Sequence, residues 1–190
     1  MIIGICGKSG SGKSTAARKL ANLGAVYLDI DTVGHRALLR PEVREEIKKE
    51  FGIESTDRKA LGDLVFNSRS KMDKLTDITW KYMQEEIDEF LELNKDYDII
   101  LDWLLLTKSK YFDMCDIKIL IDVPYEIRKK RAMQRDGITE EKFDLRESNS
   151  VDYNKDDFDF VVHEENGIEV EQNREVKALS ANMIKLLLEV

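Results

Sequence analysis

The stretch Gly7-Lys8-Ser9-Gly10-Ser11-Gly12-Lys13-Ser14-Thr15 matches the pattern G-x-x-x-x-G-K-[ST] of a P-loop. The apolar residues Ile2, Ile3 and Ile5 come before it and predict a short buried strand. The residues from 16 to 21 follow it and predict a helix. A loop rich in Gly and Ser can match this pattern by chance, but the two flanking elements are of the type that a P-loop requires. The stretch therefore predicts an α/β fold built around a phosphate-binding loop.

These residue types suit a polyphosphate. Glycines let the backbone curl so that successive N–H groups point at one anion, and the following helix adds the positive end of its dipole. Lys13 can reach the β- and γ-phosphates, and the Ser14 hydroxyl can hold Mg²⁺. We therefore expect ATP with Mg²⁺ to bind here. The expected ATP-binding residues of the loop are Gly7, Ser9, Gly10, Ser11, Gly12, Lys13, Ser14 and Thr15.

Composition narrows the class of protein. A length of 190 residues suits one domain, and a net charge of −8 argues against nucleic acid as the main partner. Cys6 and Cys115 form no C-x-x-C pair, so neither a zinc site nor a disulfide framework is indicated. No secretory signal opens the chain, and the longest apolar run, 99–106, is too short to span a membrane. We expect a soluble, cytoplasmic protein that binds small molecules, without a nucleic-acid or membrane partner.

Two carboxylates follow the second predicted strand, which covers 25–28. Asp29 and Asp31 are two residues apart, so they share one face of an extended segment. They lie just past a strand end, which is where parallel α/β sheets bind ligands. Asp31 also precedes a helical stretch over 32–39. Its position alone fits a helix N-cap as well as a functional carboxylate.

A third carboxylate, Asp102, ends the apolar strand predicted over 97–103. An apolar strand that ends in Asp is the Walker-B arrangement, in which the carboxylate faces the Mg²⁺ beside a P-loop. Many strands end in Asp, so this pattern has weight only together with the P-loop. We expect Ser14 and Asp102 to be the metal ligands.

The region 41–93 predicts helices almost throughout. Pro41 suits the first turn of a helix that ends at Gly52, and 59–66 predicts a short helical piece. From 70 to 93 apolar residues recur at helical spacing. The region is too long for one crossover connection, so we interpret it as a helical insert beside the nucleotide-binding core.

A row of arginines marks the helix predicted after Pro124. Arg128, Arg131 and Arg135 recur at spacings of three and four, so one helix face presents three guanidinium groups. Like charges this close are unfavourable unless carboxylates or a polyanion face them. A single arginine fits pairing with the protein's own carboxylates, whereas the whole row in a P-loop protein favours phosphate contact.

The helix with the arginines ends at Asp136-Gly137, and Thr139 can cap the next helix. We interpret the region of about 136–157 as a lid that closes over a transferred phosphoryl group. A fifth strand is predicted over 158–162 and a closing helix over 169–188. The order of elements predicts one domain with a five-stranded parallel sheet wrapped by helices, carrying the insert and the lid.

Taken together, these stretches resemble the dephospho-CoA kinase family. The P-loop is generic, whereas the stretches 28–35 and 57–66 are more particular to the family. The resemblance covers Gly7 to Thr15, Leu28-Asp29-Ile30-Asp31-Thr32-Val33-Gly34-His35, Phe51-Gly52, Asp57-Arg58-Lys59-Ala60-Leu61-Gly62-Asp63-Leu64-Val65-Phe66, Asp102-Trp103-Leu104-Leu105, Arg131-Ala132-Met133-Gln134-Arg135-Asp136-Gly137 and Asp159-Phe160-Val161-Val162.

The resemblance implies transfer of the γ-phosphoryl group of ATP to the ribose 3′-hydroxyl of dephospho-CoA, the last step of CoA biosynthesis. It implies that Asp31 accepts the hydroxyl proton, that lid arginines contact phosphates, and that the insert helps to hold the acceptor. The catalytic residues would then be Lys13, Asp31 and Arg135, with Arg131 added to the ATP-binding set. The substrate-binding residues would be Asp31, His35, Trp80, Asp102 and Leu105.

The chain departs from the family pattern on the acceptor side and in part of the lid. Trp80-Lys81 stands where the family usually has His-Pro, and Trp103 replaces a Pro before the double Leu. Asn149 or Ser150 stands in place of a Gln, and the Arg usual soon afterwards is missing from 152–157. Two alternatives therefore stay open, which are a kinase of another nucleoside or nucleotide and a non-catalytic paralogue that binds the cofactor.

A nucleotide-dependent switch is a further alternative, because 31–34 spells D-x-x-G and 94–97 comes close to the guanine-reading N-K-x-D. However, the first lies too soon after the P-loop and the second lacks its final Asp. A kinase is therefore favoured over a switch.

Overall fold

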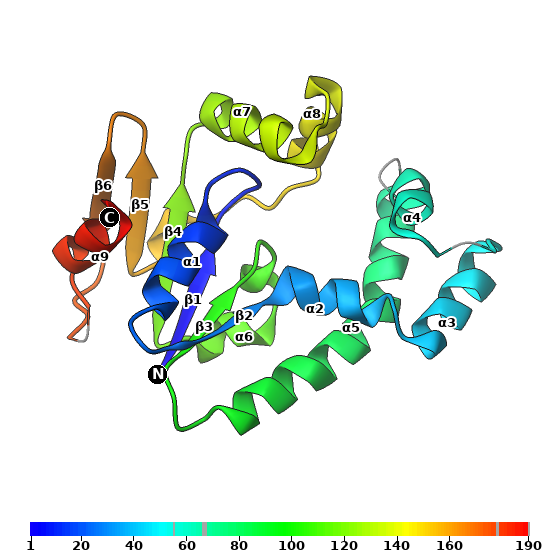
Figure 1. The fold of residues 1–190 in the computed structure, drawn as a ribbon, viewed down its shortest axis with the longest axis horizontal. Coiled ribbons are helices and arrows are strands. Elements are labelled where there is room, and N and C mark those ends of the chain that lie inside the picture. Colours follow the sequence, from blue (N-terminus) through cyan, green and yellow to red (C-terminus); the bar gives the residue numbers. More distant parts are fainter. Residues whose placement is uncertain (55, 66–67, 178, 190) are drawn as a thin grey trace. The chain divides into compact units, whose positions relative to one another are not determined.

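The computed structural model of the chain describes residues 1–54, 56–65, 68–177 and 179–189. They form two compact units, of which the first comprises Met1–Asp29 with Asn94–Val190 and the second comprises Ile30–Leu93. In Figure 1 the first unit is a sheet covered by helices, and the second consists of helices alone. Within the described residues, no helix combines the length and the apolar character needed to cross a membrane.

The first unit is organised on one sheet with the strand order β2-β3-β1-β4-β5-β6. The first five strands of this order are parallel, and β6 runs antiparallel to β5. Parallel strands are buried on both faces, which explains the continuous apolar runs of β1 and β3. The strands are β1 (Ile2–Cys6), β2 (Val26–Asp29), β3 (Ile99–Asp102), β4 (Ile117–Asp122), β5 (Phe160–Glu164) and β6 (Ile168–Gln172).

The sixth strand corrects the sequence-based prediction of five. A helix was predicted over 169–188, but the structure has β6 there, followed by α9 (Ala181–Glu189). Ile168 and Val170 pack against the core, whereas the glutamates that alternate with them are exposed, so the period of two outweighs the helical pattern. Gly167, at a φ of 138°, makes the turn before β6.

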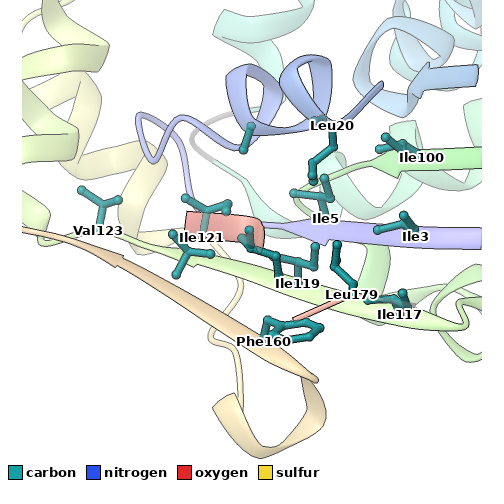
Figure 2. Packing of buried hydrophobic residues seen from close by; sticks show 14 residues of the cluster. Ile3, Ile5, Leu20, Ile100, Ile117, Ile119, Ile121, Val123, Phe160 and Leu179 are labelled. Carbon is teal, nitrogen blue, oxygen red and sulfur yellow. The ribbon is translucent and has the colours of Figure 1, made fainter. Parts of the chain in front are cut away.

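The core of the first unit forms between the sheet, α1 (Lys13–Ala21) and α9. Figure 2 shows Leu20 of α1 beside Ile5 of β1, and Phe160 of β5 beside Ile119 of β4. This packing fixes the start of α1 above the carboxyl end of β1, where the P-loop joins them. The other helical segments of this unit are η1 (Leu106–Lys108), α6 (Lys110–Met114), α7 (Tyr125–Asp136), α8 (Glu140–Ser148) and η2 (Lys155–Asp157).

The second unit has its own smaller core, in which Val43, Ile47 and Leu61 are buried. Helix α3 begins at Pro41, and Gly52, at a φ of 64°, ends it as the sequence predicted. Phe66, the predicted end of a helical piece, lies outside the described residues. The helices of this unit are α2 (Ile30–Ala37), α3 (Pro41–Phe51), α4 (Arg58–Val65) and α5 (Arg69–Leu93).

Candidate nucleotide-binding site

The loop between β1 and α1 has the curled backbone that its glycines predict. Gly10 and Gly12 have φ angles of 80° and 89°, a region that side chains disfavour. At Gly10 there is also no space, because a Cβ would lie 2.3 Å from the backbone oxygen of Arg128. Gly12 is the N-cap of α1, and its carbonyl accepts hydrogen bonds from the N–H groups of Thr15 and Ala16. The positive end of the α1 dipole therefore stands at the loop.

Ser11 makes two hydrogen bonds within this loop. Its side chain is buried at 1% exposure, and its hydroxyl accepts a hydrogen bond from the Lys13 N–H at 3.4 Å. Its own N–H donates to the Lys8 carbonyl at 3.1 Å. A Cβ on Gly7 would lie 2.5 Å from the Ser11 hydroxyl, so this glycine makes room for the serine.

Three of the predicted site residues meet beside the loop. Lys13 Nζ lies 3.3 Å from Asp102 Oδ1 and 3.5 Å from Ser14 Oγ. Asp102 ends β3 and is fully buried, at 0% exposure. Its Oδ2 accepts a hydrogen bond of 2.9 Å from the Tyr27 hydroxyl, whereas its Oδ1 accepts none from the described residues. The strand pairing explains this arrangement, because β2 lies next to β3 with Asp29 opposite Asp102.

This cluster fits a divalent cation. A hydroxyl and a carboxylate are the hard oxygen ligands that Mg²⁺ prefers, and a buried carboxylate oxygen without a hydrogen bond is costly unless a cation meets it. Among the described residues, no group of three or more His, Cys, Asp or Glu side chains is arranged to hold a metal. A cation held by Ser14 and Asp102 would therefore complete its coordination with nucleotide oxygens and water.

Burial sets the protonation of the neighbouring side chains. It raises the pKa of Tyr27, and the negative charge of Asp102 adds to that rise, so the phenol stays protonated and donates its hydrogen bond. Burial also raises the pKa of Cys6, and it raises the pKa of Cys115 to about 12. Both thiols are buried and protonated at neutral pH, as expected for small core residues.

All three arginines of the predicted row have carboxylate partners. Arg128, only 5% exposed, makes two hydrogen bonds of 2.8 Å to Glu147 of α8. Arg131 binds Glu164 through two hydrogen bonds of 3.0 and 2.7 Å. Arg135 binds the adjacent Asp136 at 2.7 and 2.9 Å. These pairs are the alternative to phosphate contact that the sequence left open, and phosphate contact by Arg131 and Arg135 stays a prediction.

A cavity of about 280 Å³ lies beside the P-loop, and Arg131 is one of its lining residues. The loop and the start of α1 contribute one wall, and the Arg131–Glu164 pair contributes polar groups. Arg135 is not among the lining residues. The cavity is lined by Ser11, Gly12, Thr15, Ala16, Lys19, Ile121, Arg131, Val162, Glu164, Ile168 and Leu188.

A charged network that the sequence analysis missed fastens the loop to α7 and α8. Lys8 Nζ lies 3.1 Å from Glu147 and 2.9 Å from Asp152. Arg128 donates to the carbonyl of Ser9 at 3.4 Å while it holds Glu147. Lys8 stands inside the quoted motif, but no local pattern marks Glu147 as its partner.

The remaining predicted residues lie on α2, on α5 and after β3. Asp31 and His35 belong to α2, one turn apart and both exposed, and Asp31 lies in the first turn rather than at the N-cap. Trp80 is half-buried on α5, and Leu105 is half-buried after β3. His35 helps to line a cavity of about 390 Å³ with Leu38, Leu39, Arg44, Thr56 and Asp57.

The chain is similar in sequence to known proteins over about three quarters of its length. A dephospho-CoA kinase from Aquifex aeolicus is 37% identical over 152 residues, which cover 76% of this chain and 77% of the relative. A dephospho-CoA kinase from Dehalococcoides mccartyi is 33% identical over 74% of this chain and 76% of the relative.

Solved structures show the same likeness. TT1252 from Thermus thermophilus is 31% identical, covers 80% of each chain and has a TM-score of 0.68. The dephospho-CoA kinase from Campylobacter jejuni, 22% identical, shares the fold with a TM-score of 0.53 over 87% of this chain and 89% of its own. The family model described as dephospho-CoA kinase matches residues 1–169. The chain therefore belongs to the dephospho-CoA kinase family.

Proposed function

We propose that the protein transfers the γ-phosphoryl group of ATP to the ribose 3′-hydroxyl of dephospho-CoA. The cluster of Lys13, Ser14 and Asp102 beside a curled P-loop carries the donor half of this proposal. Family membership, with a relative that is 37% identical, supports the choice of acceptor.

On the donor side, the N–H groups of the loop and the Lys13 ammonium bind the β- and γ-phosphates. Ser14 and Asp102 hold Mg²⁺, which neutralises phosphate charge when it is bound. The base of ATP occupies the cavity beside the loop, where Val162, Ile168 and Leu188 provide apolar contact. The Arg131 guanidinium stacks on the base or contacts a phosphate from the same cavity.

On the acceptor side, Asp31 accepts the proton of the 3′-hydroxyl as that oxygen attacks the γ-phosphorus. Asp31 is an exposed residue in the first turn of α2. The helical unit holds the rest of the acceptor, with Trp80 on α5 and the cavity beside His35 as contact points. In that cavity Arg44 suits the diphosphate and the leucines suit the pantetheine chain.

The region of about 136–157 acts as the lid over this reaction in one kinase domain. Arg135 lies next to its hinge at Gly137, whose φ is 61°. When the lid closes, Arg135 leaves Asp136 for the transferred phosphoryl group, where a guanidinium stabilises the charge that develops. Leu105, which follows the Asp102 strand, borders the acceptor.

A different acceptor has less support. Trp103, one of the departures from the family pattern, is only 6% exposed, and its backbone N–H donates to the Ile5 carbonyl at 3.2 Å. It therefore belongs to the core rather than to an acceptor surface. Trp80-Lys81 remains as the departure that another acceptor would exploit.

A panel of acceptors with ATP and Mg²⁺, read by ADP release and by mass spectrometry of the product, tests the proposal. Dephospho-CoA should raise ADP release well above the ATPase background and gain one phosphate. The proposal fails if a nucleoside gives this signal and dephospho-CoA does not. Tight binding of dephospho-CoA without transfer, at saturating ATP and Mg²⁺, would instead indicate the non-catalytic paralogue.

A further inference from the structure

The two oxygens of the Asp102 carboxylate have different surroundings. Oδ2 accepts the hydrogen bond of 2.9 Å from the Tyr27 hydroxyl, and Oδ1 lies 3.3 Å from the Lys13 ammonium. The whole side chain is buried, so water does not compensate for a missing partner. One oxygen is therefore occupied by a neutral donor, and the other is left to a cation.

The hydroxyl of Tyr27 fixes this division. The terminal torsion of an Asp side chain has a broad minimum, so packing alone holds the carboxylate plane weakly. A directed hydrogen bond to Oδ2 selects one orientation and turns Oδ1 toward the loop. Tyr27 reaches Asp102 because β2 and β3 are neighbouring parallel strands in register, with Tyr27 opposite Ile100.

We propose that Tyr27 is a positioning residue, which orients Asp102 so that its Oδ1 binds the divalent cation that accompanies the nucleotide. This inference rests on the proposed function for the identity of the reaction, but it concerns the metal site alone. The Lys13 ammonium beside Oδ1 marks the place that a cation takes. When Lys13 turns to the nucleotide phosphates, Oδ1 remains aimed at the same point because the phenol still holds Oδ2.

The test is the Tyr27→Phe variant, which removes one hydroxyl and keeps the ring. Free Mn²⁺, measured by electron paramagnetic resonance in the presence of ADP, gives the dissociation constant of the metal without any acceptor. We expect this constant to rise about tenfold, as for other residues that orient a metal ligand. Binding of ADP without metal, measured by calorimetry, should stay within about twofold because the Tyr27 hydroxyl donates its hydrogen bond to Asp102 and not to the nucleotide-binding loop.

Tyr153→Phe is the matched control, because its hydroxyl donates a hydrogen bond of 2.7 Å to the carbonyl of Leu104 rather than to a carboxylate. It should lower the free energy of unfolding by about 1 kcal/mol without changing the Mn²⁺ constant, whereas Tyr27→Phe, which removes a hydrogen bond to a buried carboxylate, should cost about 1.5–3 kcal/mol. Thermal unfolding of both variants checks that they fold.

A double-mutant cycle isolates the route through Asp102. In an Asp102→Asn background, Tyr27→Phe should change the Mn²⁺ constant by less than about twofold, because the ligand that it orients is gone. An unchanged constant in Tyr27→Phe alone, an equal change in Tyr153→Phe, or a full effect in the Asp102→Asn background would each overturn the inference. A failed acceptor panel with a shifted Mn²⁺ constant would overturn the proposed acceptor and leave this inference standing.

Discussion

Charges are placed differently in the first unit, 1–29 with 94–190, and in the second unit, 30–93. We call the first the nucleotide-binding unit and the second the helical unit. In the nucleotide-binding unit, Asp102 is fully buried beside Lys13, and Arg128 is nearly buried against Glu147. In the helical unit, the pairs Arg36–Glu86 and Arg40–Glu85 lie at the surface or are partly covered. Buried ions are costly to desolvate and stabilise a fold only while both partners are present, whereas exposed pairs contribute little.

This contrast indicates where stability and activity are coupled. In the nucleotide-binding unit the buried charges include both the pair that holds the P-loop and the proposed metal ligand, so a substitution there should affect stability and activity together. In the helical unit the charges can be removed at little cost to the fold. Asp31 tests the rule, because it is exposed in the helical unit and is nevertheless the proposed base.

Asp31→Asn should have the largest effect on activity. Loss of a general base lowers turnover by about 10²- to 10⁴-fold, whereas ATP affinity should stay within about twofold. The free energy of unfolding should fall by less than about 1 kcal/mol, which is the value of a carboxylate in the first turn of a helix. Steady-state kinetics, calorimetry with ATP and chemical denaturation measure the three quantities.

Glu42→Gln is the control for this prediction, because Glu42 is an exposed acid in the first turn of α3. It should cost a similar fraction of a kcal/mol and leave turnover unchanged. Normal turnover in Asp31→Asn would remove Asp31 from the role of base and leave the helical unit without a catalytic residue.

Arg128→Ala should be the most destabilising change. It removes the two hydrogen bonds that Glu147 accepts from Arg128, leaves Lys8 as the remaining partner of Glu147 and frees the Ser9 carbonyl, at a cost of about 3–5 kcal/mol. Chemical denaturation measures the loss. The KM for ATP should rise, because residues 8–10 of the loop contact Arg128 or Glu147.

Arg128→Lys keeps the charge but cannot form the bidentate pair, so it should recover only part of the stability. A loss below about 1 kcal/mol in Arg128→Ala would mean that the buried pair behaves like a surface pair, and the contrast between the units would fail.

Much of the fold is visible in the sequence because its signals are local. The P-loop, the apolar strands and the amphipathic pattern of α5 depend only on near neighbours in the chain, and the structure confirms them. Strand β6 was missed because its alternation is short and consists of Ile168 and Val170 between glutamates. Its partner is β5, and a hairpin at the edge of the sheet adds little apolar pattern.

The site was only partly predictable because its pairs depend on register and packing. Lys13, Ser14 and Asp102 were found through motifs, and the structure brings them together. Tyr27 and Asp102 are 75 positions apart, and only the pairing of β2 with β3 makes them neighbours. The carboxylate partners of the arginine row lie in α8, in β5 and at the end of α7, and no spacing rule in the sequence identifies them.

A fall in pH should lower mainly the stability of the nucleotide-binding unit. The Arg135 guanidinium, and after it Arg146, lowers the pKa of Asp136 to about 2, and Arg128 and Arg131 lower the pKa values of Glu147 and Glu164. A lowered pKa in the folded state gives stability that is present above the unfolded pKa near 4 and is lost as pH falls toward 2. Asp136 alone should account for about 1–2 kcal/mol after allowance for its partial exposure.

Thermal unfolding between pH 5 and pH 2 measures this loss, and Asp136→Asn should make the pH dependence shallower. An unchanged slope in that variant would show that the Arg135–Asp136 pair is as weak as an exposed one.

Arg36→Ala should have the smallest effect and is the sharpest check on the helical unit. The Arg36 side chain is 47% exposed, and water can solvate Glu86 when its partner is removed. We therefore expect a loss of about 0.2–1 kcal/mol in the free energy of unfolding, and the difference from the original protein should shrink at 1 M salt. Arg36→Ala combined with Glu86→Gln isolates the pair energy in a double-mutant cycle. A pair energy above about 2 kcal/mol that persists at high salt would mean that the helical unit also depends on its charged pairs, because only a desolvated pair resists screening in this way.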